Sequence, residues 1–235
     1  MKVKFVYLIP NFFTALSAFL GVMSIISSSQ GKFEKAFIYI MLSLIADGLD
    51  GRLARLTNTT SKFGVEFDSL ADVIAFGVAP AMMLFFSIGS EYGRFGALVS
   101  GLYVVFGAIR LARFNVTTSE NDPRYFIGLP IPTAAVVLSS WIMLELKYRS
   151  NCDYIVLFGA LLLAFLMVSN FRYPSFKKMD LNKNVAFKVL IVLILISSLI
   201  YLYPVEAIAS ILSLYTFYGL YRGIKGYLKI IKTKR

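Results

Sequence analysis

Residues 47–72 read DGLDGRLARLTNTTSKFGVEFDSLAD, and this stretch sets four carboxylates in a fixed frame. Asp47 and Asp50 are three residues apart, whereas Asp68 and Asp72 are four residues apart. On an α-helix either spacing puts both side chains of a pair on one face. Two such helices facing each other would therefore bring all four acid groups to one point.

The acidic stretch lies between apolar segments, MLSLIA before it and VIAFGVAPAMMLFFSI after it. The chain of 235 residues is 58% hydrophobic and 16% charged, with a mean hydropathy of +0.73. This composition is typical of a polytopic membrane protein. We predict an all-α fold, a transmembrane helix bundle of about eight spans, each near the ~20 residues that cross a bilayer core. The predicted spans are about 5–28, 33–56, 65–88, 95–114, 129–146, 154–171, 185–203 and 205–221.

Basic residues orient these spans. With an even number of spans, both termini share one side, and that side collects 19 of the 24 lysines and arginines. The other side holds only Lys32, Lys35, Arg94, Lys147 and Arg149. Because cytoplasmic loops carry the excess of basic residues, both termini and the acidic stretch are predicted to be cytoplasmic. The net charge of +11 then reflects topology and anionic lipid or phosphate, and we expect no nucleic-acid partner.

We expect one integral membrane domain over residues 1–235, with a catalytic core at about 5–135 and extra spans at about 154–221. The first apolar run is longer than the h-region of a cleavable signal peptide. One cysteine, Cys152, excludes an internal disulfide. Since histidine is absent, a carboxylate is the natural candidate for a general base.

The four acids need a positive partner. Two unit charges 4 Å apart repel by about 4 kcal/mol at an effective dielectric of 20. Each carboxylate at membrane depth costs roughly 2.5–3.5 kcal/mol more. Ligands that are all oxygen suit a hard cation, Mg²⁺, Mn²⁺ or Ca²⁺. The stretch therefore predicts a divalent metal site.

The spacing D-x2-D-G-x2-A-R-x8-G-x3-D-x3-D, filled at every fixed position, resembles the signature of the CDP-alcohol phosphotransferase family. The segments DSLADVIAFGVAPA, FGVEF, RLARFNV and GLPIPTAA, together with Pro10-Asn11-x-x-Thr14, are similar to its phosphatidylserine synthase branch. The resemblance extends over about residues 10–135. It implies a transferase of phospholipid biosynthesis that joins L-serine to CDP-diacylglycerol or CDP-archaeol and releases CMP.

The resemblance also implies roles for single residues. Asp47, Asp50 and Asp68 would be metal ligands for two ions, Mg²⁺ or Mn²⁺, and Asp72 would be both the general base and a ligand. The CDP-lipid would be held by Asn11, Thr14, Gly51, Ala54, Arg55, Thr59, Thr60, Ser61 and Gly64. Apart from the resemblance, Arg110, Arg113, Asn115 and Arg124 are candidates for a serine pocket, because the carboxylate of serine needs a cation. The expected partners are the CDP-lipid, L-serine, membrane lipids and a second copy of the chain.

The same residues fit alternative roles. Glycines near the acids are also typical of helix packing, and arginines at helix ends are also typical of positive-inside anchoring. An enzyme of the same family with another acceptor, such as glycerol 3-phosphate, inositol phosphate or an amino alcohol, fits the same motif. A cation transporter is a more distant alternative, because acids within membrane spans also bind transported ions. Against it, the acids are predicted at the cytoplasmic ends, and no inverted repeat is evident.

Overall fold

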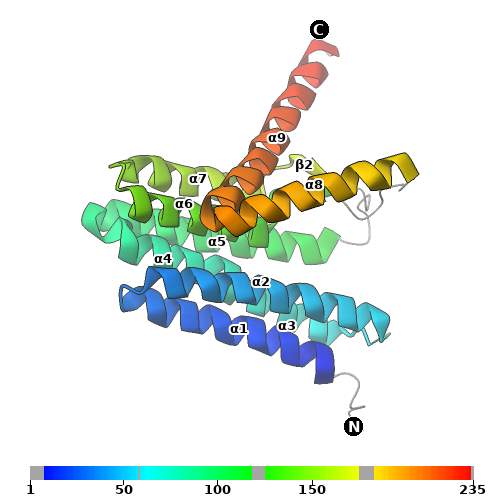
Figure 1. Ribbon diagram of the computed structural model, residues 1–235, viewed down its shortest axis with the longest axis horizontal. Coiled ribbons are helices and arrows are strands. Elements are labelled where there is room, and N and C mark those ends of the chain that lie inside the picture. Colours follow the sequence, from blue (N-terminus) through cyan, green and yellow to red (C-terminus); the bar gives the residue numbers. More distant parts are fainter. Residues whose placement is uncertain (1–7, 58, 118–124, 175–182, 234–235) are drawn as a thin grey trace.

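The structure is a computed structural model of the whole chain, and it is a bundle of long helices (Figure 1). It describes residues 8–57, 59–117, 125–174 and 183–233, apart from the side chains of 8, 174, 183–188 and 226–233. Helices α1 to α7 form the bundle, α9 packs on it through α6, and α8 contacts α9 (Figure 1). Each of the eight segments predicted as a span contains a helix within the described residues.

Helices α1 (Leu8–Ser29) and α2 (Phe33–Leu56) form an antiparallel hairpin that packs along its full length. Gly31 makes the turn between them with φ +71°, a conformation that favours glycine. The hydroxyls of Ser17 and Ser43 lie 2.8 Å apart across the helix interface, and both are buried. These small polar residues let the two backbones approach closely, which fixes α1 against the acidic end of α2.

The third predicted span is helical but not uniform. It consists of α3 (Lys62–Asp72), the π-helix η2 (Val73–Val78) and α4 (Ala79–Ser87). The π-helix begins directly after the last aspartate, and such segments often occur at functional sites. α1 packs against η2 at Gly21, where an added Cβ would lie 2.7 Å from the Cα of Ala75.

The buried core lies between η2, α4 and the next three helices. These are α5 (Gly93–Thr117), α6 (Ile131–Tyr148) and α7 (Asp153–Val168), and α5 is preceded by the 3-10 turn η3 (Gly89–Tyr92). Tyr103 of α5 is fully buried, and its hydroxyl donates to the carbonyl of Phe76 in the π-helix at 3.5 Å. The core therefore supports the segment that follows Asp72.

Two short strands depart from the all-α expectation. β1 (Tyr125–Ile127) and β2 (Arg172–Pro174) pair antiparallel, with Phe126 opposite Tyr173. They join the segment before α6 to the segment after α7. Hydropathy does not predict them, because each is three residues long and lies next to a helix.

The last two helices are α8 (Lys183–Leu202) and α9 (Pro204–Thr233). α9 packs on α6 and on β2, where an added Cβ at Gly219 would meet the ring of Tyr173. It then continues well past the predicted end near residue 221 and projects away from the bundle (Figure 1).

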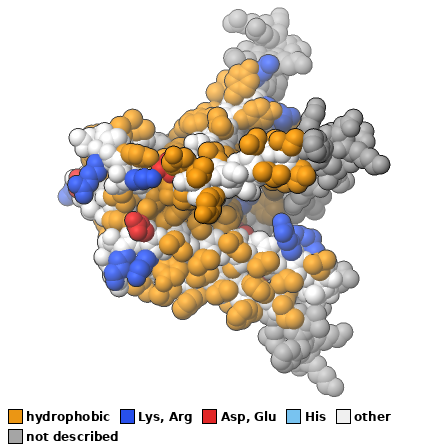
Figure 2. All heavy atoms as spheres, in the orientation of Figure 1, with side chains coloured by type: hydrophobic (Ala, Val, Ile, Leu, Met, Phe, Trp, Pro, Cys, Tyr) orange, Lys and Arg blue, Asp and Glu red, His pale blue; other side chains and the backbone are white. Residues whose placement is uncertain are grey.

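Three helical stretches of the described chain are long and apolar enough to cross a membrane: Ile9–Ser29, Lys62–Ser87 and Gly89–Thr117. Two shorter apolar helices are Asp153–Val168 and Val189–Leu202. Figure 2 shows a face of the bundle covered by hydrophobic side chains, with lysine and arginine gathered toward its ends. A membrane-embedded helix bundle accounts for this surface.

Candidate active site

The acidic residues of α2 and α3 meet where these two helices pack beside α1. One ligand oxygen from each of Asp47, Asp50 and Asp68 lies within 4.8 Å of the other two. The helical spacing of each pair and the facing of the two helices produce this convergence, as the sequence predicted. Three carboxylates so close together need a cation or protons between them.

Asp72 lies next to this group and deeper in the protein. It is 8% exposed, and its carboxyl group is close enough to that of Asp47 for the two to interact. Two carboxyl groups approach in this way only when a proton or a cation lies between them. The second oxygen, Oδ1, is buried and has no hydrogen-bond partner. A buried oxygen without a partner is unfavourable unless a proton or a cation joins it.

Helix α1 contributes a hydroxyl to the acidic cluster. Thr14 is buried, and its Oγ1 lies 2.7 Å from Oδ2 of Asp50 and 3.2 Å from the carbonyl of Pro10. A donor of this kind fixes the orientation of a carboxylate that binds a metal. Thr14 thus holds Asp50 in place from the neighbouring helix.

The donor set fits a hard divalent cation. Every candidate ligand atom is a carboxylate oxygen, and the three atoms lie within 4.8 Å of one another. Oxygen ligands of this kind suit Mg²⁺ or Mn²⁺, and Ca²⁺ to a lesser degree in so small a group. Asp47, Asp50 and Asp68 would hold the first ion, and Asp72 beside Asp47 would extend the site.

A cavity of about 210 Å³ opens beside Asp50 and Asp68. All nine residues predicted to hold the CDP-lipid line it: Asn11, Thr14, Gly51, Ala54, Arg55, Thr59, Thr60, Ser61 and Gly64. They come from α1, α2, the connecting loop and the start of α3. The carboxylates and these residues thus form one site.

The loop between α2 and α3 is shaped by its own hydroxyl groups. Ser61 is the N-cap of α3, and its Oγ accepts from the backbone N–H of Gly64 at 3.0 Å. The hydroxyls of Thr57 and Thr59 lie 2.7 Å apart. Thr57 was not predicted to take part in the site. Its place at the end of α2, close to Thr59 and Thr60, was nevertheless a signal for hydrogen bonds among these hydroxyls.

Gly51 leaves space in the cavity that the protein itself does not fill. A Cβ added at Gly51 would meet only Nη1 of Arg55, at an ordinary 3.7 Å. Helix packing therefore does not require a glycine there. Pro10 and Val65 also line the cavity and were not predicted, although each adjoins a predicted residue.

The four predicted serine ligands have different surroundings. Arg113 is held by protein acceptors: its two terminal nitrogens donate to the carbonyls of 127, 167, 168 and 169 and to Oδ1 of Asn170. Arg113 thus joins α5 to the end of α7. Both of its terminal nitrogens are occupied by protein acceptors, which argues against the predicted role in binding serine. Asn115 exchanges hydrogen bonds with Ser69, which follows Asp68. Arg124 lies outside the described residues.

Arg110 is the remaining arginine. It is 7% exposed, its Nε has no hydrogen-bond partner, and its charge interacts with that of Asp72. Its guanidinium also lies 5.2 Å from the ring centre of Phe114. Arg110 is therefore a buried cation beside the acidic cluster.

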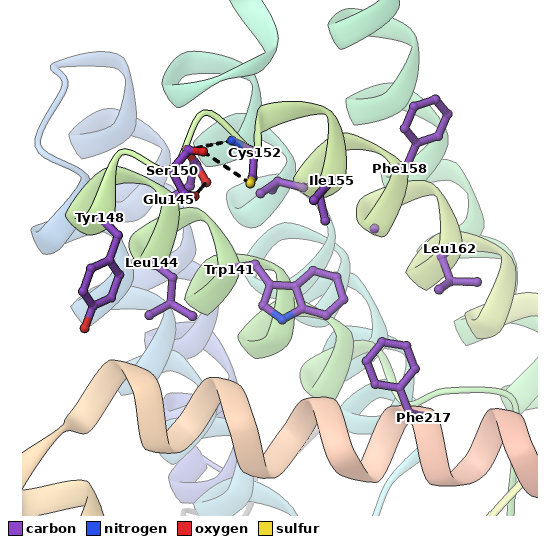
Figure 3. A pocket seen from close by; sticks show the side chains of 12 residues that line it. Trp141, Leu144, Glu145, Tyr148, Ser150, Cys152, Ile155, Phe158, Leu162 and Phe217 are labelled. Atoms are coloured by element: carbon purple, nitrogen blue, oxygen red, sulfur yellow. Dashed lines mark hydrogen bonds between the residues drawn. The ribbon is translucent and has the colours of Figure 1, made fainter.

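A larger cavity of about 590 Å³ lies between α6, α7 and α9 (Figure 3). Its walls are mostly apolar, with Trp141, Phe158, Leu162 and Phe217 among them. At one end Glu145 accepts from Ser150 and from the backbone N–H of Cys152. None of the predicted site residues lines this cavity, and it holds no group of converging acids.

Comparisons with known proteins agree with the motif. A model of the CDP-alcohol phosphatidyltransferase family matches residues 7–170. Over 237 residues the chain is 50% identical to a protein of Helicobacter pylori (strain ATCC 700392 / 26695) named CDP-diacylglycerol–serine O-phosphatidyltransferase, covering 100% of this chain and 98% of that one.

Two archaeal relatives are also similar. A protein of Methanocaldococcus jannaschii with the same printed name is 32% identical over 226 residues, which are 96% of this chain and 98% of that one. An archaetidylserine synthase of Methanothermobacter thermautotrophicus is 37% identical over 168 residues, covering 71% and 69% of the two chains. The family predicted from the motif is thus confirmed, and the chain belongs to the CDP-alcohol phosphatidyltransferase family.

Proposed function

We propose that this protein is a phosphatidylserine synthase, which transfers the phosphatidyl group of CDP-diacylglycerol to the hydroxyl of L-serine and releases CMP. The observation that carries the proposal is the convergence of three carboxylates beside a cavity lined by all nine predicted CDP-lipid residues. The names of relatives that match nearly the whole chain support serine as the acceptor.

The cavity suggests how the CDP-lipid is oriented. Gly51 and Ala54 leave room for a flat pyrimidine beside α2, and Arg55 on the same helix reaches the diphosphate. Thr59, Thr60 and Ser61 supply hydroxyls for phosphate or cytidine. The diphosphate then lies next to the acidic cluster, because Asp50 and Asp68 line the same cavity.

Asp47, Asp50 and Asp68 would hold divalent ions, with Asp72 completing the set. Ions bound there would neutralise the diphosphate and make its phosphorus more electrophilic. Thr14 keeps Asp50 oriented for this task through its 2.7 Å hydrogen bond.

Asp72 is the general base of the proposed reaction. Its unpartnered Oδ1 accepts the proton of the serine hydroxyl. The hydroxyl oxygen forms a bond to the phosphorus that carries the diacylglycerol. The bond from that phosphorus to the bridging oxygen breaks, and CMP leaves with the electron pair.

We place the protein in the cell membrane with eight spans, both termini and the active site on the cytoplasmic side, and one catalytic domain whose core is about residues 5–135. This location suits the substrates, since the acyl chains of the CDP-lipid lie in the bilayer whereas serine and CMP are cytoplasmic solutes. We also expect a homodimer.

The decisive experiment supplies the purified protein with CDP-diacylglycerol or CDP-archaeol, labelled serine and Mg²⁺ or Mn²⁺, and identifies the products by mass spectrometry. We expect serine-containing phospholipid and CMP in equal amounts, and neither product after chelation of divalent metal. Glycerol 3-phosphate, inositol phosphate and ethanolamine are tested in parallel. CMP release with one of these and not with serine would reassign the acceptor, and cation flux without CMP release would favour a transporter.

Asp72→Asn tests the assignment of the base. The amide keeps the shape of the carboxyl group but cannot take a proton, so turnover should fall by about 10²–10⁴-fold. Thermal unfolding should show that the variant is folded. Normal turnover by a folded Asp72→Asn protein would remove Asp72 from the mechanism.

A further inference from the structure

The apolar cavity between α6, α7 and α9 has no part in the proposed reaction (Figure 3). Its volume of about 590 Å³ is within the range of sites that bind small molecules. The residues that line it belong to the predicted spans 129–146, 154–171 and 205–221 or to the turn between the first two. Ile155 and Phe158 on its wall are 69% and 60% exposed. The cavity therefore opens toward the hydrocarbon of the bilayer, where a lipid chain can enter it.

Contacts around Trp141 fix the shape of this cavity. The indole N–H donates to the hydroxyl of Ser213 on α9 at 2.9 Å. Gly159 of α7 lies so close to the ring that an added Cβ would be 2.6 Å from its Cζ3 atom. The indole is thus held between two helices, and it forms part of the cavity wall together with Phe217 (Figure 3). The apolar wall is therefore a defined surface rather than a loosely packed region.

A buried carboxylate lies at one end of the apolar cavity. Glu145 is 8% exposed and accepts hydrogen bonds from the Ser150 hydroxyl and, at 3.2 Å, from the backbone N–H of Cys152 (Figure 3). Both donors are neutral, and the start of α7 adds only about half a unit of positive charge. No described lysine or arginine forms an ion pair with Glu145. Since a buried carboxylate in a membrane span usually has a cationic partner, we expect a bound molecule to supply the cation.

A basic residue adjoins the same end of the cavity. Arg149 is exposed between two lining residues, Tyr148 and Ser150, and forms no ion pair with a described carboxylate. It ends α6 in the left-handed conformation, with φ +47°, and its backbone N–H donates to the carbonyl of Glu145 at 2.7 Å. An anion and a cation thus flank one end of an apolar cavity. A phospholipid with an ammonium in its head group carries the complementary charges and a chain that suits the apolar walls.

We propose that this cavity binds one chain of a membrane phospholipid whose head group carries an ammonium, with the ammonium at Glu145 and the phosphate at Arg149. This lipid site is separate from the CDP-lipid cavity, because the two cavities share no lining residue. In the predicted topology it faces the outer leaflet, whereas the acidic cluster faces the cytoplasm. Binding there is therefore independent of which acceptor the enzyme uses.

Trp141 is the single tryptophan of the sequence, so its fluorescence reports on this cavity alone. The purified full-length protein is reconstituted in vesicles that contain a small fraction of phospholipid with brominated chains, which quench tryptophan fluorescence on contact. Brominated phosphatidylethanolamine is compared with brominated phosphatidylglycerol, which has the phosphate but no ammonium. We expect phosphatidylethanolamine to quench Trp141 at a mole fraction about 3- to 10-fold lower, the range for one partly exposed charged contact.

Two results with the unmodified protein would overturn the proposal. Quenching by phosphatidylglycerol that equals or exceeds quenching by phosphatidylethanolamine would mean that lipid fills the cavity without recognition of its ammonium. Absence of quenching by either lipid would mean that something else covers the cavity, such as a second copy of the chain. N-acetylated brominated phosphatidylethanolamine, whose nitrogen carries no charge, should quench no better than phosphatidylglycerol.

Variants assign the two charges of the site. Glu145→Gln keeps an acceptor for Ser150 and Cys152 but removes the charge, so the preference for phosphatidylethanolamine should disappear while quenching by phosphatidylglycerol remains. Arg149→Gln should weaken quenching by both lipids by the same factor, because each carries a phosphate. A preference that survives in Glu145→Gln, or that is lost in Arg149→Gln alone, would overturn the assignment.

Glu91→Gln is the matched control. Glu91 is an exposed carboxylate that is also predicted on the outer side, and it does not line the cavity. This variant should keep the full preference for phosphatidylethanolamine, and its loss there would show that the preference reflects the general surface charge instead of the proposed site. If Glu145→Gln does not fold, the N-acetylated lipid with the unmodified protein still decides whether the ammonium is recognised.

Discussion

At the scale of single residues, the sequence around the acidic motif predicted which residues lie together beside the carboxylates. The nine residues expected around the CDP-lipid line one cavity because they lie within short segments whose helical geometry is regular. The hydrogen-bond partners of Arg113 could not be predicted in this way. Its partners come from as far as 57 residues away, and only the packing of α7 against α5 brings them together.

Gly51 illustrates how a contact separates two roles that the sequence leaves open. A glycine needed for helix packing would have a neighbouring helix where its Cβ would be, as Gly21 does. Gly51 has only the flexible end of Arg55 there, and it faces the cavity. The space is therefore kept for a ligand.

Gly51→Ala should consequently change stability and activity in opposite directions. In a helix interior, alanine is more favourable than glycine by up to about 1 kcal/mol, so the melting temperature should rise slightly. The new methyl group occupies cavity space, so kcat/KM for CDP-diacylglycerol should fall by about tenfold or more, the effect of roughly 1.4 kcal/mol.

Gly48→Ala is the control for this substitution. It lies one turn earlier on α2, does not line the cavity, and has no atom within 4 Å of an added Cβ. It should gain similar stability and keep its activity. Full activity of Gly51→Ala would show that the nucleotide does not approach α2 at this point.

At the scale of elements, hydropathy predicted each helical segment but not the irregular pieces. The π-helix η2 is invisible in the sequence, because its residues, VIAFGV, are equally suited to an α-helix. It depends on tertiary packing, with α1 on one side and the Tyr103 hydroxyl on another. The strands β1 and β2 likewise form only because α6 and α7 bring their ends together.

The contact between α1 and η2 couples the fold to the site. α1 carries Asn11 and Thr14, and η2 continues from Asp72, so the distance between these two elements sets how the cavity and the base are aligned. Gly21 makes this approach possible.

Gly21→Ala should destabilise the protein although alanine favours helices. Its Cβ would lie 2.7 Å from the Cα of Ala75, which is backbone and cannot turn away. Overpacking of this kind costs about 1–3 kcal/mol and should outweigh the gain in helix propensity. Thermal unfolding in detergent measures the loss, and serine transfer should decrease with it.

Gly101→Ala provides the comparison, since Gly101 is exposed on α5 and nothing lies within 4 Å of an added Cβ. This variant should be at least as stable as the unmodified protein. A melting temperature of Gly21→Ala equal to that of Gly101→Ala would mean that α1 and η2 can separate without cost.

At the scale of the whole molecule, contacts between distant segments join turns that the sequence predicts on the same side of the membrane. At one end, Glu206 accepts from Lys147 and Tyr148, and Tyr92 donates to Asp153 at 3.2 Å. All of these residues lie at turns predicted to be outside. At the other end, β1 pairs with β2, and both adjoin loops predicted to be cytoplasmic. Consecutive long helices thus alternate in direction, while the number of spans stays a prediction.

The absolute orientation in the membrane is a prediction from the distribution of charge, and the single cysteine of the sequence can test it. Cys152 is the single cysteine of the sequence, and it is partly exposed at the start of α7, between Arg149 and Tyr154 on the predicted outer side. A maleimide that does not cross membranes should label it in right-side-out vesicles and leave it unlabelled in sealed inside-out vesicles.

In the control, Cys152→Ser combined with Lys62→Cys moves the thiol to the exposed start of α3, beside the acidic cluster, and should reverse the pattern. Labelling of Cys152 only from the cytoplasmic side would mean that the protein has the opposite orientation in the membrane. The carboxylates would then face away from serine and CMP, and the proposed reaction would lose its access to both solutes.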